Sequence, residues 1–327
     1  MADSNHQMVN KLTFFPSHAL YAYSCGLLDA VFAPVLDDEE KYSLINMDPC
    51  SVVKFDSSGS SYVKYRFHEA FNMDFIGVLS HDLYTFPQVL KVGNGAEVAD
   101  YNTTPIVNDC FGQTPSYNGW SMSNINAFLD TVQIDFTSDM TNYLGTFLFG
   151  KKWTAPINVD IKQTLNIDYG YKAKKTISGK TISTMNYSKA GRWLMDAWEL
   201  SDTQYNTRHI GSDSRNGVRT WTVSMTSVQD SNMMSQNNML NSNNWSIDTN
   251  SQYSTDDSGN SFYNTSNSND FYSAVIKKTM GGHLPCVVRI SDSNNSDQWA
   301  IVRISDYKIT QNNPKLVDIK LVLEEQV

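Results

Sequence analysis

Short apolar segments separated by turn signals recur through the first half of the chain, and they constrain the fold more than any other feature. Ser51–Phe55 and Tyr62–Phe67 flank a DSSGSS turn, and Phe75–Leu79 follows as FIGVL. Alternation in Tyr62–Phe67 is typical of a strand with one buried face, whereas a continuous apolar run is typical of a sandwich core. Such segments continue to Phe149 at a spacing of about 8–12 residues, which predicts an all-β sandwich.

Composition agrees with a mainly β chain. Only 18% of the 327 residues are charged and 40% are hydrophobic. Asn, Ser and Thr take the place of charged residues, and they compete with the backbone hydrogen bonds of helices. The length fits two domains of ordinary size.

The chain is expected to change character at Lys151–Pro156. We predict an irregular N-terminal arm over residues 1–50, a jelly-roll sandwich over 51–156 and a second β domain over 157–327. In the arm, Ala19–Pro34 is apolar and fits either a short helix or a buried segment. Pro34 ends it, since proline disfavours helix in the residue before it.

The second half carries three further signals. Lys175–Thr184 alternates around Ser178-Gly179, which predicts a hairpin. Asp230–Asp270 is about half Ser and Asn, so it is predicted to be a long polar surface insertion. Phe271–Met280 has apolar residues at helical spacing and stops at Gly281-Gly282, which predicts one short helix.

Charge and cysteine content exclude several classes of function. The net charge is −9, which disfavours specific nucleic-acid binding. The densest basic stretch, Lys172, Lys174, Lys175 and Lys180, is interpreted as a solvated strand face. The four cysteines form no CxxC pair, so we predict neither a metal site nor a cofactor. No apolar run approaches about 20 residues and the start is polar, so we expect cytoplasmic synthesis without membrane insertion.

Motifs for catalysis are incomplete. Ser178–Thr181 imitates the end of a phosphate-binding loop, but Lys174 stands where the first glycine belongs. His81-Asp82 has no nucleophile that the sequence identifies as its partner, and His283 lies in a turn signal. The chain is therefore predicted not to be an enzyme, although paired carboxylates for glycoside hydrolysis come together only in a fold.

Three aromatic residues are candidates for binding. Tyr117, Trp120 and Trp245 lie in polar, turn-rich surroundings. They would stack on sugars or serve as core or interface anchors. The role as core or interface anchors is favoured, because Trp and Tyr are enriched at interfaces.

Two regions resemble structural proteins of marine and cyanobacterial tailed bacteriophages. Asn72–Val92, especially Met73–Ile76 and Leu79–Leu83, resembles a segment of their galactose-binding-like jelly-roll domains, and Tyr143–Pro156 is similar to a later one. The end of the chain from Asp270, with FYSAVIKKTMGGHLPCVVR and DQWAIVR, resembles their closing pattern and the general shape of distal tail and minor tail proteins.

The resemblance implies a jelly-roll sandwich followed by a split β-barrel-like domain. It also implies a tail-tip or baseplate role in a virion, as a homo-oligomeric ring of threefold or sixfold symmetry that contacts tail tube, hub or other baseplate proteins. Two alternatives remain open: a module that binds host surface glycans, and, less favoured, a polysaccharide depolymerase. Cys286 stands where the pattern has Phe, and Asp82 where it has Asn.

Overall fold

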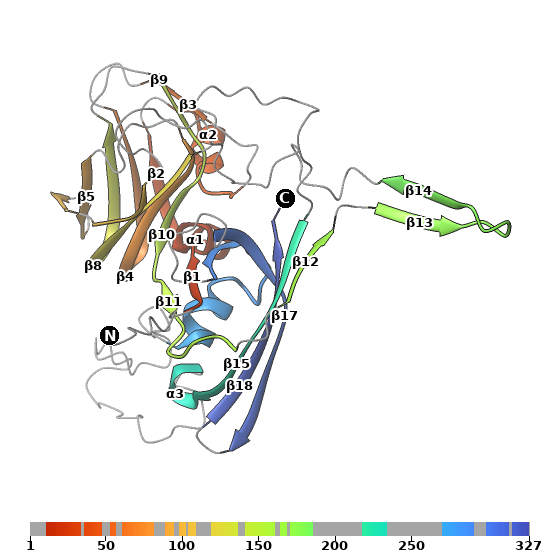
Figure 1. Cartoon of the computed structure of the whole chain (residues 1–327). Coiled ribbons are helices and arrows are strands. Elements are labelled where there is room, and N and C mark those ends of the chain that lie inside the picture. Colours follow the sequence, from red (N-terminus) through yellow and green to blue (C-terminus); the bar gives the residue numbers. More distant parts are fainter. Residues whose placement is uncertain are drawn as a thin grey trace, which may run out of the picture.

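A computed structural model describes most of the chain outside residues 186–217 and 234–269. The described residues are 11–33, 36–47, 53–56, 61–81, 89–94, 98–102, 104–108, 119–136, 141–160, 164–168, 171–185, 218–233, 270–290, 299–313 and 316–326. They form mainly antiparallel β structure with a few short helices (Figure 1), as the sequence predicts. The aromatic-rich sequence of Gly191–Leu200 also predicts a strand, but this segment and nearly all of the polar insertion lie outside the described residues.

The first sheet is built on two long strands, β4 (Ser61–His81) and β8 (Gly119–Phe136). Its main path is β10-β4-β8-β5-β6, and β2 and β7 pair in addition with β4 and β8. The shorter strands are β2 (Leu28–Phe32), β5 (Val89–Gly93), β6 (Ala99–Asp100), β7 (Thr104–Asn108) and β10 (Phe147–Gly150). A separate pair, β3 (Val53–Asp56) and β9 (Thr141–Leu144), lies beside this sheet.

Register shifts divide both long strands into halves with different neighbours. The first half of β4 pairs with β2, and its second half pairs with β10. The first half of β8 pairs with β7, and its second half pairs with β5. Bulges bend strands, so the halves form two layers of a sandwich that share β4 and β8.

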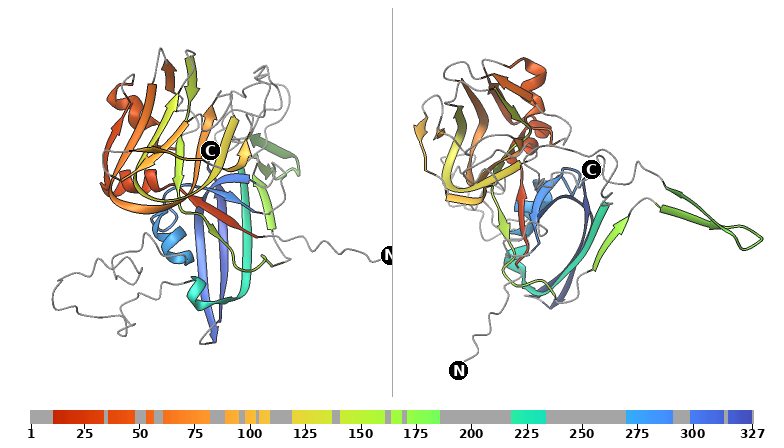
Figure 2. Two further views of the ribbon diagram at one scale, coloured as in Figure 1. Left: turned by 90° about the vertical axis from the view of Figure 1, so that its left-hand side faces the viewer. Right: turned by 45° about the horizontal axis from the view of Figure 1, so that its top comes forward.

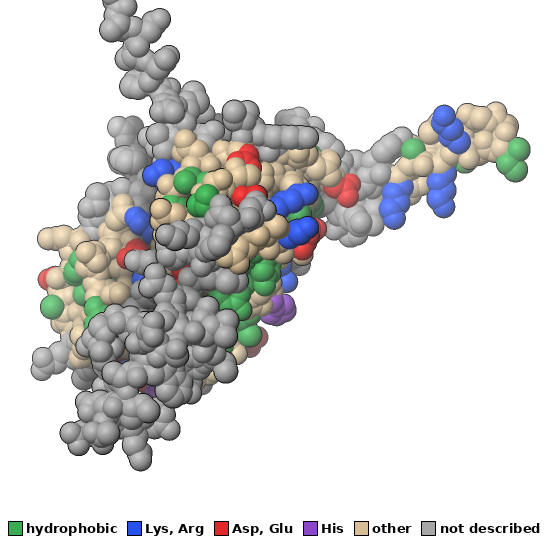
Figure 3. All heavy atoms as spheres, turned by 90° about the horizontal axis from the view of Figure 1, so that it is seen from below, with side chains coloured by type: hydrophobic (Ala, Val, Ile, Leu, Met, Phe, Trp, Pro, Cys, Tyr) green, Lys and Arg blue, Asp and Glu red, His purple; other side chains and the backbone are tan. Residues whose placement is uncertain are grey.

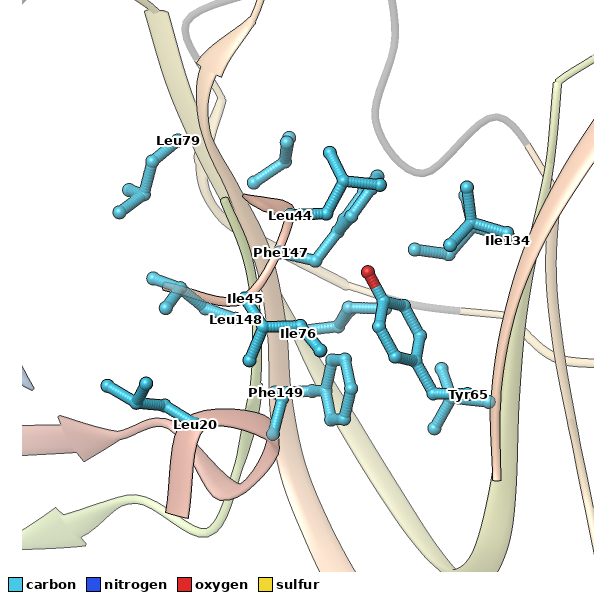
Figure 4. Close-up of a cluster of buried hydrophobic side chains, with 14 of the residues drawn as sticks. Leu20, Leu44, Ile45, Tyr65, Ile76, Leu79, Ile134, Phe147, Leu148 and Phe149 are labelled. Carbon is cyan, nitrogen blue, oxygen red and sulfur yellow. The ribbon is translucent and has the colours of Figure 1, made fainter. Parts of the chain in front are cut away.

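The sandwich core is aromatic and aliphatic. Side chains from β4, β8 and β10 meet those of α1 (His18–Cys25) and the turn after α2 (Asp38–Ser43), as Figure 4 shows. Tyr65 lies 5.0 Å from Phe149, measured between ring centroids. All of Phe75–Leu79 is buried, which confirms the prediction from its continuous apolar run.

The second sheet has the order β11-β1-β16-β17-β18-β15-β12. It is strongly curved (Figure 2), but among the described strands its two ends, β11 and β12, do not pair with each other, so this part is an open sheet. Its strands are β1 (Thr13–Pro16), β11 (Trp153–Thr154), β12 (Thr164–Asp168), β15 (Val218–Gln229), β16 (Cys286–Arg289), β17 (Trp299–Asn313) and β18 (Leu316–Glu325). The short helix α3 (Asp230–Met233) follows β15.

Strand β1 joins the two hydrophobic cores, because neighbouring side chains of a strand point to opposite faces. Phe14 packs in the core of the second sheet, 5.8 Å from Phe271 between ring centroids. Phe15 packs in the sandwich core, 5.2 Å from Phe75. The described part of the expected N-terminal arm contains β1, α1, β2 and α2, and buried apolar residues on both faces stabilise β1 as a central strand. The domain boundary near residue 156 stays a prediction.

The predicted short helix is a π-helix, η2 (Tyr272–Lys277). The two glycines after it allow the chain to pack closely against the second sheet. Gly281 and Gly282 both have positive φ, of 73° and 95°. A Cβ on Gly282 would lie 2.1 Å from the carbonyl oxygen of Ile304 in β17. The two glycines therefore let the turn lie directly against the sheet, and this assigns a packing role to the GGHLP motif.

Candidate interaction site

The three predicted aromatic residues are only partly placed. Tyr117 and Trp245 lie outside the described residues. The backbone of Trp120 lies at the start of β8, opposite Leu79 of β4. Both strands end there, so the backbone of Trp120 belongs to one end of the sandwich.

The same end of the sandwich holds a partner for His81 that the sequence did not reveal. His81 Nε2 lies 3.0 Å from Ser121 Oγ, and both side chains are buried. Burial lowers the pKa of His81 to about 3, so its ring is neutral at physiological pH. The two residues are 40 positions apart, and only the register of β4 on β8 brings them together. Their burial makes this a hydrogen bond that satisfies polar groups within the fold rather than a reactive pair.

A small cavity lies where η2 meets α1 and β4. It is lined by Pro16, His18, Phe71, Asn72, Lys151, Ala274 and Lys278. The His18 ring stacks on Phe71 with centroids 3.8 Å apart, and Lys278 Nζ lies 3.4 Å from His18 Nδ1. Desolvation, with a smaller contribution from Lys278, lowers the pKa of His18 well below its usual value. The volume of about 10 Å³ is room for about one water molecule, so this cavity is too small for a sugar or nucleotide.

The predicted hairpin is confirmed, and it forms a two-stranded sheet of its own. Strands β13 (Tyr171–Lys175) and β14 (Thr181–Met185) pair with each other and, among the described strands, with no other. Gly179 takes a φ of 80° in the connecting turn. Thr176 Oγ1 accepts a hydrogen bond from the Lys180 backbone N–H at 3.1 Å. A strand follows this turn instead of a helix, which excludes a phosphate-binding loop.

The hairpin stands clear of both sheets in Figures 1 and 2. Its four lysines are exposed, Ile177 at its tip is fully exposed, and Ile182 is 54% exposed. Figure 3 shows the lysines spaced along it and a hydrophobic tip. We call residues 171–185 the hairpin arm. A two-stranded hairpin alone is marginally stable in water.

A second exposed surface combines aromatic rings with carboxylates. Tyr23 of α1 and Tyr42 of α2 contact each other with centroids 5.2 Å apart, yet are 48% and 41% exposed, and Phe32 of β2 is 45% exposed. Residues 37–42, DDEEKY, carry four acidic residues and one Lys, a net −3. We call Tyr23, Tyr42 and the carboxylates of Asp37 and Glu39 the acidic aromatic patch. Exposed aromatic clusters of this kind are typical of interfaces.

Two classes of site have no counterpart in the part of the chain that the structure describes. No group of three or more His, Cys, Asp or Glu side chains there has the arrangement of a metal site. None of the described helices is long and apolar enough to cross a membrane.

Comparisons with known proteins yield structural similarities only. No protein-family model matches the chain, and no curated protein matches it. Solved structures that share part of its fold include CpGH89CBM32-6 produced by Clostridium perfringens, with 13% identity and a TM-score of 0.30 over 37% of this chain and 92% of that one. A chitosan-binding module of a Paenibacillus chitosanase/glucanase matches with 9% identity and a TM-score of 0.29, over 37% and 94%.

A third structure, the CBM32 of AlyQ in complex with 4,5-unsaturated mannuronic acid, has 14% identity and a TM-score of 0.28, over 37% and 94%. These neighbours are carbohydrate-binding modules. Identities and TM-scores this low support no inference about what the present chain binds.

Proposed function

We propose that this chain is a non-enzymatic structural protein of a tailed-bacteriophage virion, in its tail tip or baseplate, and that it acts by binding other subunits. The hairpin arm is the observation that carries the assembly role. Its side chains belong to neither hydrophobic core, and Ile177 at its tip is fully exposed. A partner surface would bury this tip and stabilise the strand pair.

The virion assignment rests on the sequence resemblance of residues 72–92, 143–156 and 270–327. In the fold these segments supply buried strands and the Gly281-Gly282 turn, which are structural roles. An arm on one subunit that reaches a different surface on the next is a heterologous contact. Such contacts close into rings, and a tail supplies threefold or sixfold symmetry for the ring.

Mass spectrometry of purified particles tests this proposal. The chain should be present in phage particles that encode it, in a fixed ratio to the other tail proteins, and should stay with tails separated from heads. Its absence from particles that are complete and infectious would contradict the proposal.

Glycan binding by the sandwich is the second candidate, and the position of Trp120 favours it. This residue starts β8 at an end of the sandwich, and stacking on a sugar is one of the two roles expected of its ring. A glycan array probed with the full chain tests this function. Binding to a defined glycan that Trp120→Ala abolishes would support it, while an array without signal would exclude it for the glycans present.

A further inference from the structure

We propose that the hairpin arm of one copy docks on the acidic aromatic patch of a second copy of this chain. The inference rests on the proposed assembly function and names the partner of the arm. It follows from the shape of the arm, from the chemistry of the two surfaces and from the charge of the whole chain.

One face of the arm suits the patch better than the other. Directly opposite residues of an antiparallel pair lie on the same face. Lys172 pairs with Thr184 and Lys174 with Ile182, so two ammonium groups and one exposed aliphatic side chain share a face. The opposite face carries a single lysine, Lys175, and it ends at the Tyr171–Met185 pair.

The acidic aromatic patch offers the complementary groups. Glu39 is exposed on α2, and Asp37 is exposed at its N-terminus. The rings of Tyr23 and Tyr42 lie together on the same surface. Lysine ammonium groups bind both carboxylates and aromatic faces. Within this same protein Lys278 Nζ lies 4.2 Å from the centroid of the Tyr21 ring.

Charge favours a second copy as the partner. Residues 171–185 contain four lysines and no acidic residue, a charge of +4. The whole chain carries −9, which leaves −13 for the rest. A basic arm on an acidic body is attracted to the body of another copy, and such complementarity steers association.

The contact is head-to-tail, because arm and patch are different surfaces. Each copy uses its arm on one neighbour and offers its patch to another. The patch contributes burial for Ile182 and Ile177, and the carboxylates contribute specificity for the lysines.

Sedimentation velocity of the full chain at 0.15 M salt tests the inference. Wild type should self-associate in a concentration-dependent way. Lys174→Glu should raise the dissociation constant about tenfold or more, because it reverses a charge on the docking face. Lys175→Glu makes the same change on the opposite face and should raise it less than about threefold. Glu39→Lys alters the patch without touching the α2 capping box, which uses Asp37 and Glu40, and should match Lys174→Glu.

A mixing experiment separates this contact from any other. Lys174→Glu copies keep an intact patch, and Glu39→Lys copies keep an intact arm. Each alone should be monomeric at concentrations where wild type forms larger species. Their mixture should associate again, because it contains one intact contact and a second contact in which the two opposite charges are exchanged.

Loss of association in both single variants, with renewed association in their mixture, supports the inference. A wild type that stays monomeric up to about 100 µM, well above the micromolar range of ordinary weak association, would overturn self-docking. Association that both variants leave unchanged would overturn the arm-to-patch contact. Neither of these two results removes the protein from virions, so the particle analysis still tests the proposed function separately.

Discussion

Replacing Phe75 by Ala should destabilise the whole protein, because Phe75 lies where the two cores meet. Its side chain is fully buried, and its ring contacts Phe15 edge-to-face with centroids 5.2 Å apart. Truncating a buried Phe costs about 3–5 kcal/mol through lost burial and the cavity that remains. Phe128 of β8 is 48% exposed, so Phe128→Ala is the matched control and should cost less than about 1 kcal/mol.

The Phe15 contact adds an expectation about cooperativity. Phe15 and Phe14 are neighbours in β1, one in each core. Loosening the sandwich at Phe75 should therefore also loosen the second sheet, and both should unfold in one transition. A double-mutant cycle of Phe15→Ala with Phe75→Ala should give a coupling of about 0.5–1.5 kcal/mol.

Urea unfolding followed by circular dichroism and by tryptophan fluorescence measures both effects. The two probes should give one coincident transition whose midpoint falls in Phe75→Ala. A loss as small as that of Phe128→Ala would refute the burial argument. Two separate transitions, of which Phe75→Ala moves only one, would refute the coupling through β1.

Three further changes test particular contacts. Lowering the pH should destabilise the protein, because burial keeps His81 neutral in the folded state. Between pH 7.5 and 5.5 this histidine binds a proton only in the unfolded chain, which lowers the free energy of unfolding by about 1.4 kcal/mol. His81→Asn should lose that part of the pH dependence in urea titrations, and an unchanged slope would contradict it. Gly282→Ala should lower the melting temperature far more than Gly281→Ala, since both have positive φ but only Gly282 faces a carbonyl oxygen; equal effects would show that the close approach does not matter. Glu325→Ala should cost about 3 kcal/mol in calorimetry, because Glu325 is buried with its carboxylate 3.0 Å from Arg219 Nε, whereas a neutral result would mean that the pair is not needed for stability.

The sequence predicts those elements that are determined by a few neighbouring residues. The continuous apolar run at Phe75–Leu79 and the turn at Ser178-Gly179 specify their structures within a few residues. The stop at Gly281-Gly282 was found in the same way, although the helix before it is a π-helix.

Features that depend on distant residues were not predictable. Thr13–Pro16 is a strand only because β16 and β11 lie on either side of it. Ser121 meets His81 through the register of two long strands, and Tyr23 meets Tyr42 through the packing of two helices. The sequence pattern of Trp299–Ile304 and Tyr307–Ile309 predicts two separate strands. They form one strand, β17, because a register shift between Ile304 and Asp306 is accommodated without a turn.

Cryo-electron microscopy of the assembled protein, in purified tails or as the self-assembled chain, would show directly where the hairpin arm lies. We expect residues 171–185 to lie on a neighbouring copy, with Lys174 and Ile182 against Tyr23 and Tyr42. A reconstruction in which the hairpin arm projects into solvent, or folds back on its own subunit, would contradict the claim that it is an assembly arm.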